Sequence, residues 1–99
     1  MRTVLALCAC ALLAGAVLDT GAAAERPVTL KDAPGRAMVE NLCSGCHSLD
    51  YIRINAPFMN RQVWTAEVNK MIQAFAAPIS QPDAAIIVDY LAANYGPPG

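Results

Sequence analysis

The stretch Cys43-Ser44-Gly45-Cys46-His47 places two cysteines three positions apart and follows them with the only histidine of the 99-residue chain. This spacing is typical of covalent haem attachment, because each thiol adds to one haem vinyl group and the imidazole then lies under the iron. We therefore predict one covalently attached haem c, with Cys43 and Cys46 as thioether anchors and His47 as an axial iron ligand, and we expect the fold to form around it.

Other uses of two closely spaced cysteines suit the sequence less well. A thioredoxin-like dithiol belongs to a βαβ setting, and no strand pattern flanks this run. A zinc site takes four ligands, and no cysteine or histidine follows His47 to complete one. A disulfide between Cys43 and Cys46 would close a small, strained ring. A haem-free redox dithiol is the main alternative.

Residues 1–24 have the pattern of a secretory signal peptide. An apolar stretch at 4–18 follows an early positive charge, and three alanines at 22–24 supply a cleavage signal. The stretch is too short for a membrane span and is interrupted by Asp19. We expect a periplasmic protein without a membrane span; a lipoprotein signal at Cys10 is the less favoured alternative.

The mature chain is expected to be one small domain. We divide it into an N-terminal arm at 25–33 and a haem domain at 34–96. Only two cysteines remain after removal of the leader, so disulfides cannot staple the domain, and an apolar macrocycle would supply the missing core. The formal net charge of -1 and the absence of a basic patch argue against binding to nucleic acid.

The first predicted helix covers about 34–43. Asp32 is a good cap, and Pro34 is tolerated in a first helical turn. Gly35 on this helix either leaves room for another helix to cross closely or is a glycine that is tolerated in a first helical turn. The segment 48–57 is predicted to be turn and irregular loop.

Two longer helices are predicted in the second half. Asn60 caps a helix over 61–75, and Ser80 opens a capping-box pattern for a last helix that ends near residue 94. The first of these carries an apolar stripe at helical spacing, formed by Trp64, Val68, Met71, Ile72 and Phe75. Without a strand pattern, the sequence predicts an all-α, small class I cytochrome c-like domain of about three helices around one haem.

A second axial ligand has to be sought among the methionines, because the chain has no second histidine. Met38 precedes the attachment run (residues 43–47) and approaches from the His47 side. Met59 lies twelve residues after His47, a tight reach around the haem edge, whereas Met71 lies twenty-four residues after it on an apolar helix face. We prefer Met71 and keep Met59 as the alternative, although a methionine on such a stripe ordinarily fills a core. A thioether ligand raises the potential and occupies the site where small ligands bind, which favours electron transfer.

Supporting roles are predicted for several neighbours of the attachment run. A carbonyl near Pro57 is a candidate acceptor for the Nδ1–H group of His47. Candidate haem contacts are Arg53, Arg61, Tyr51 and Trp64; the alternatives are solvated arginines and a tryptophan that belongs to the core. We expect the loop 54–59 to lie at a partner interface, with charge at the two arginines affecting the docking rate.

Several blocks of the mature chain resemble one bacterial family. They are the attachment run with its extension Asp50-Tyr51-Ile52, the block Trp64-x-x-Glu67-Val68-x-Lys70-Met71-Ile72, Ala77-Pro78-Ile79 and Tyr90-Leu91-Ala92. Together they cover about 35–96 and resemble the small single-haem cytochrome subunit of bacterial sulfite dehydrogenases, the sulfite:cytochrome c oxidoreductases.

The resemblance implies a periplasmic electron-transfer subunit that is not an enzyme by itself. It would accept electrons from a molybdenum-cofactor subunit that oxidises sulfite and pass them to a soluble cytochrome c, with His47 and Met71 as the iron ligands. The family has a glycine where this chain has Ala76, and alanine costs about 1 kcal/mol there if φ is positive. The other functions to weigh are a free-standing diffusible cytochrome c and a haem sensor or peroxidase with an open sixth site.

Overall fold

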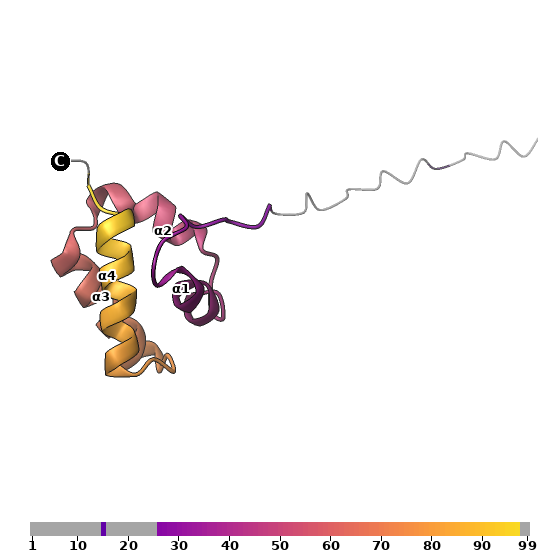
Figure 1. Ribbon diagram of the computed structural model, residues 1–99. Coiled ribbons are helices and arrows are strands. Elements are labelled where there is room, and N and C mark those ends of the chain that lie inside the picture. The colour runs from indigo at the N-terminus through magenta and orange to yellow at the C-terminus, as the bar shows by residue number, and fades with distance from the viewer. Residues whose placement is uncertain (1–14, 16–25, 98–99) are drawn as a thin grey trace, which may run out of the picture.

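The computed structural model describes residue 15 and residues 26–97, so the predicted signal peptide lies outside the described residues apart from one position (Figure 1). Within 26–97 the elements are helical, and no strand is present: α1 (Arg36–Cys43), α2 (Asp50–Asn55), the 3-10 turn η1 (Ala56–Phe58), α3 (Arg61–Phe75) and α4 (Gln81–Asn94). The all-α class is confirmed for this part of the chain. None of its helices has the length and apolar composition that a bilayer span requires.

Helices α3 and α4 begin where their capping residues predict. The Asn60 side chain accepts a hydrogen bond of 3.0 Å from the backbone N–H of Val63, and the Ser80 hydroxyl accepts one of 3.2 Å from the N–H of Asp83. Each cap satisfies a backbone donor that has no partner within the helix. The two helices lie side by side and form one wall of the molecule (Figure 1).

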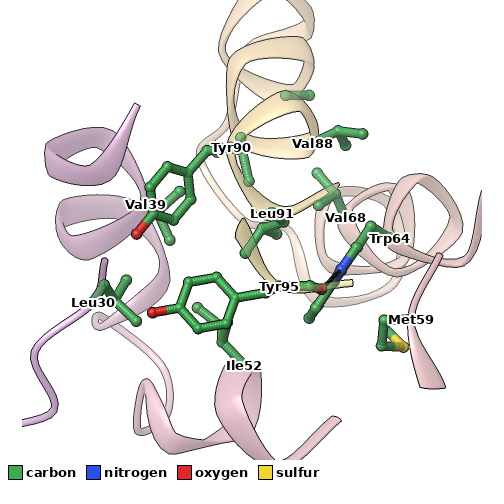
Figure 2. Close-up of a cluster of buried hydrophobic side chains, with 12 residues drawn as sticks. Leu30, Val39, Ile52, Met59, Trp64, Val68, Val88, Tyr90, Leu91 and Tyr95 are labelled. Atoms are coloured by element: carbon green, nitrogen blue, oxygen red, sulfur yellow. Dashed lines mark hydrogen bonds between the residues drawn. The ribbon is translucent and has the colours of Figure 1, made fainter. Parts of the chain in front are cut away.

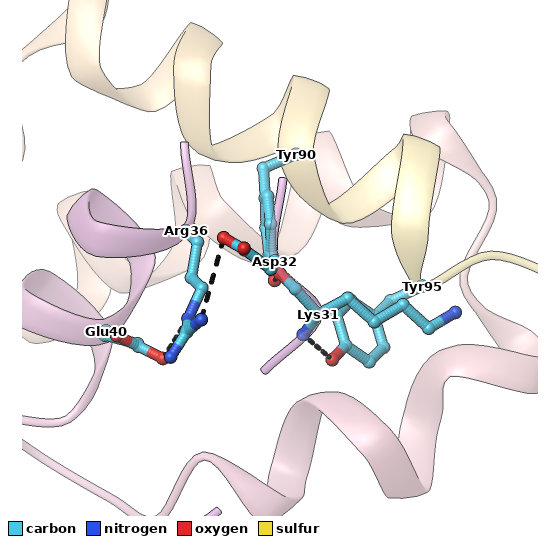
Figure 3. A network of polar contacts seen from close by, with 6 residues as sticks. All are labelled: Lys31, Asp32, Arg36, Glu40, Tyr90 and Tyr95. Atoms are coloured by element: carbon cyan, nitrogen blue, oxygen red, sulfur yellow. Dashed lines mark hydrogen bonds and ion pairs between the residues drawn. The ribbon is translucent and has the colours of Figure 1, made fainter. Parts of the chain in front are cut away.

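The start of α1 differs from the prediction. The helix begins at Arg36, and its N-cap is Gly35, with φ of 95° and no side-chain cap, so Asp32 does not cap it. A Cβ at Gly35 would lie 3.0 Å from the Cβ of Tyr90 on α4, which confirms the predicted close helix crossing. Asp32 instead forms an ion pair of 3.7 Å with Arg36, whose guanidinium also donates to Glu40 at 2.8 Å (Figure 3).

The prediction of an irregular loop at 48–57 is wrong. Residues 50–55 form α2, and the 3-10 turn η1 follows directly, with Pro57 in its first positions. Buried Ile52 provides the apolar contact that fixes this short helix against the core. A helix of six residues has too few turns to show a periodic sequence pattern, which is why the sequence alone missed it.

The core lies between α1, α3 and α4 (Figure 2). Its most deeply buried large side chains are Trp64, Tyr90, Leu30, Ile87 and Val39. The indole N–H of Trp64 donates a hydrogen bond of 2.6 Å to the backbone carbonyl of Tyr95, so the one polar atom of this side chain is paired inside the core.

Two tyrosines of the C-terminal segment hold the N-terminal arm against the helices. The Tyr90 hydroxyl donates to the carbonyl of Lys31 at 2.6 Å, and the N–H of Lys31 donates to the Tyr95 hydroxyl at 2.9 Å (Figure 3). Burial and the neighbouring Tyr95 raise the pKa of Tyr90 to about 12, so its hydroxyl stays a donor. The arm is also held by Leu30, whose side chain is part of the buried core.

Candidate functional site

An apolar cavity of about 450 Å³ opens beside the attachment run; we call it the main cavity. Its walls come from the end of α1, the attachment run, the end of α3 and the connector before α4. The lining residues are Leu42, Cys43, Cys46, His47, Met71, Phe75, Ala77 and Ile79. Apart from the imidazole, every one of these side chains is aliphatic, aromatic or sulfur-containing.

The two cysteines reach the main cavity from different environments. Cys43 is the last residue of α1 and is half-buried, whereas Cys46 is exposed, and both are free thiols. Burial, with a smaller contribution from Cys46, raises the pKa of the Cys43 thiol. Cys43 and Cys46 both line the main cavity, and no disulfide links them.

His47 is exposed, and its ring has one hydrogen-bond partner within the described residues. Its Nδ1 lies 3.0 Å from the carbonyl oxygen of Ser48. A hydrogen on Nδ1 donates to that carbonyl and leaves Nε2 with its lone pair, which is the tautomer that binds a metal through Nε2. The acceptor belongs to the residue next to His47 and not to the segment around Pro57.

Only one of the three candidate methionines shares a cavity with His47. Met71, in the last part of α3, lines the main cavity. Met59 is 6% exposed and belongs to the core cluster, near Trp64 in Figure 2. Met38 packs against the same core from α1. The structure thus brings together Cys43, Cys46, His47 and Met71.

A second, small cavity of about 40 Å³ shares three residues with the main cavity: Cys43, His47 and Met71. Tyr51, Trp64 and Glu67 also line it. The Tyr51 hydroxyl donates a hydrogen bond of 2.9 Å to Glu67 Oε1, and the Tyr51 ring centroid lies 5.5 Å from that of His47.

Glu67 was not predicted as a site residue, although it lies in the block that carries the family resemblance. Its other oxygen pairs with Lys70 Nζ at 2.7 Å, and its side chain is 16% exposed. Burial alone would raise the pKa of this carboxyl, but hydrogen bonds from Lys70 and Tyr51 and the charge of Lys70 lower the pKa overall. The only sequence signal was its position one helical turn before Met71.

The two arginines proposed as haem contacts line neither cavity. Arg53 lies 3.8 Å from Asp50 on the surface of α2. Arg61 pairs with Asp89 of α4 at 2.6 Å and lines a separate groove between α3 and α4. Trp64 lines the small cavity, but its N–H is bonded to the core carbonyl described above.

A wider, open hollow of about 540 Å³ lies between the attachment run and the start of the arm. It is lined by Cys46 and His47 but by neither Cys43 nor any methionine. The main cavity, in contrast, is lined by both thiols, the imidazole and Met71, and the small cavity by Cys43, His47 and Met71.

The main cavity has the chemistry that a covalently held haem needs. Two thiols and an imidazole stand on one wall, a thioether stands on another, and apolar side chains complete the lining. Among residues 26–97 no three side chains of the types His, Cys, Asp and Glu gather as a metal-binding group. A haem iron held by one imidazole and one thioether requires no such group.

A scan against protein-family models finds none that matches the chain, and a search of curated proteins finds no match.

Proposed function

We propose that the chain is a single-haem c-type cytochrome that transfers electrons in the periplasm. The observation that carries the proposal is the main cavity, whose lining contains both thiols, the only histidine and Met71. Cys43 and Cys46 would anchor the haem as thioethers, and His47 and Met71 would hold its iron. Bound there, the haem supplies a one-electron carrier whose potential depends on the axial ligands and on the apolar surroundings.

The protein residues then have three tasks. Ser48 accepts the hydrogen bond that orients His47, Met71 would supply the second ligand to a haem iron, and the apolar lining would shield the haem from water. No side chain is assigned to acid–base or nucleophilic catalysis. The chain is therefore proposed as an electron-transfer subunit and not as an enzyme by itself.

The proposed electron donor follows from the family resemblance. It is a molybdenum-cofactor subunit that oxidises sulfite, and the acceptor is a soluble cytochrome c. Exposed apolar side chains support a docking surface on the α2–η1 segment: Ile54 is 70% exposed and Phe58 is 79% exposed. Such side chains lose contact with water when a partner covers them.

Co-purification from the native periplasm tests the donor assignment. We expect the haem-containing chain to elute with a molybdenum-containing subunit and to be reduced when sulfite is added to the complex. A chain that elutes alone, and that sulfite does not reduce in the periplasmic extract, would instead be a free-standing diffusible cytochrome c.

A further inference from the structure

His47 and Met71 belong to separate parts of the chain, so some contact has to fix their relative position. His47 precedes α2, whereas Met71 lies on α3, and η1 and a short link separate the two helices. Among residues 26–97, one hydrogen bond joins the segment 43–58 to α3: the bond from the Tyr51 hydroxyl to Glu67.

The acceptor of this bond is itself held in place. Glu67 Oε1 receives the Tyr51 hydroxyl at 2.9 Å, while Oε2 lies 2.7 Å from Nζ of Lys70, three residues further along α3. With both oxygens engaged and the side chain 16% exposed, the carboxylate has one preferred orientation. Hydrogen bonds to an ionised acceptor are shorter and stronger than those between neutral groups.

Tyr51, the donor of this bond, lies beside His47. The ring centroids of Tyr51 and His47 are 5.5 Å apart, with the ring planes tilted by 54°. Both rings line the small cavity, as do Glu67 and Met71. The imidazole is thus bounded by the carbonyl of Ser48 at Nδ1 and by the phenol ring on another side.

We propose that Tyr51 and Glu67 are positioning residues for the iron site: their hydrogen bond ties the start of α2 to α3 and so sets how His47 and Met71 face each other across the haem. This inference rests on the proposed function, because it assigns these residues a role toward the haem. Neither residue is proposed to contact the iron or to take up an electron.

Competition by free imidazole in the ferric haem-containing protein measures how firmly Met71 is held. Imidazole takes the second axial position only after the thioether leaves, so its apparent affinity rises when Met71 is poorly placed. We expect Y51F and E67A each to raise that affinity about tenfold, which corresponds to about 1.4 kcal/mol. E67Q retains a hydrogen-bonding oxygen and is expected to stay closer to the unmodified protein than E67A does.

The matched control is Y90F. It also removes one tyrosine hydroxyl from a hydrogen bond, of 2.6 Å to Lys31, but Tyr90 lines neither cavity. We expect Y90F to lower the urea midpoint of unfolding and to leave imidazole affinity and the ferric electron paramagnetic resonance spectrum unchanged. Y51F is expected to change both the imidazole affinity and the ferric electron paramagnetic resonance spectrum.

Two results would overturn the inference. If Y51F and E67A bind imidazole with the affinity of Y90F, the hydrogen bond does not position the ligands, while a low-spin haem in the unmodified protein would still support the proposed function. If the unmodified protein carries no covalently attached haem, the proposed function fails together with this inference.

Discussion

His47 and Met71 are twenty-four positions apart in the sequence, yet both line the main cavity and the small cavity. Helix α3 makes this possible, because its Asn60 cap fixes where the helix starts and its buried Trp64 and Val68 fix which side faces inward. Residue 71 then falls on the inward-facing side one turn after Glu67.

We expect M71A to convert the ferric haem from low spin to high spin and to lower the reduction potential, because the thioether that stabilises ferrous iron is lost. The ferrous form of the variant should bind carbon monoxide rapidly. Absorption spectroscopy and potentiometric titration measure these changes. A low-spin ferric spectrum that M71A leaves unaltered would reject Met71 as a ligand.

The matched variant for that test is M59A. Met59 is 6% exposed within the core cluster, so its truncation is expected to cost about 2–5 kcal/mol of unfolding free energy. Its ferric spectrum should stay low spin. If M59A loses the low-spin spectrum and M71A keeps it, the alternative ligand of the sequence analysis is the correct one.

Ala76 gives a test of local backbone strain. It follows α3 with φ of 54° and ψ of 36°, which is the left-handed conformation that favours glycine. We expect A76G to raise the unfolding free energy by about 1 kcal/mol, because glycine adopts this conformation without a steric penalty. The control A74G, inside α3, should lower it by about 0.5–1 kcal/mol in the same urea titration. If the A76G variant is no more stable than the unmodified protein, the backbone at Ala76 is not strained.

Much of this fold is predictable from local signals. Helices α3 and α4 begin directly after Asn60 and Ser80, whose side chains cap them as the sequence indicates. Ala76 has the positive φ that the resemblance raised as a condition. Pairwise tertiary contacts are not predictable in this way. The Tyr51–Glu67 bond joins residues sixteen positions apart, and nothing in either local pattern specifies the other partner.

The exposed end of the predicted stripe on α3 shows a second limit. Trp64 and Val68 are buried as expected, but Phe75 is 65% exposed and lines the main cavity. A hydrophobic period identifies the inward side of a helix but does not tell whether that side meets a core or the wall of a cavity. Arg61 was predicted to contact the haem but pairs with Asp89 on α4, and no local sequence pattern specifies that partner.

The lowered pKa of Glu67 predicts a pH dependence of stability. The carboxyl of Glu67 has an ordinary pKa of 4.5 in the unfolded chain and a lower pKa in the native protein, so the native carboxyl binds a proton more weakly. Its stabilising contribution is therefore complete above pH 4.5 and is lost as the pH falls through the lower native pKa. We expect the unfolding free energy of the unmodified protein to fall more steeply in this acid range than that of E67Q. Urea titrations at neutral and acid pH measure how far the unfolding free energy of each protein falls. An equal fall in both proteins would contradict a lowered native pKa of Glu67.

The proposed docking surface predicts two different salt responses. Exposed Phe58 is apolar, so F58S should weaken binding to the proposed molybdenum-cofactor subunit about tenfold at both low and high salt. Arg53 is a surface charge, so R53E should slow electron transfer mainly at low salt. Stopped-flow reduction at two ionic strengths distinguishes them. A partner that reacts with both variants at the unmodified rate at low salt docks elsewhere.

The central claim is that a haem is bonded to Cys43 and Cys46, and one preparation of the purified mature protein tests it through its intact mass and its pyridine haemochrome spectrum. We predict a mass that exceeds the processed polypeptide by one haem and a haemochrome spectrum of the two-thioether type. A colourless protein that has the mass of the polypeptide alone and keeps its helical fold would contradict the account.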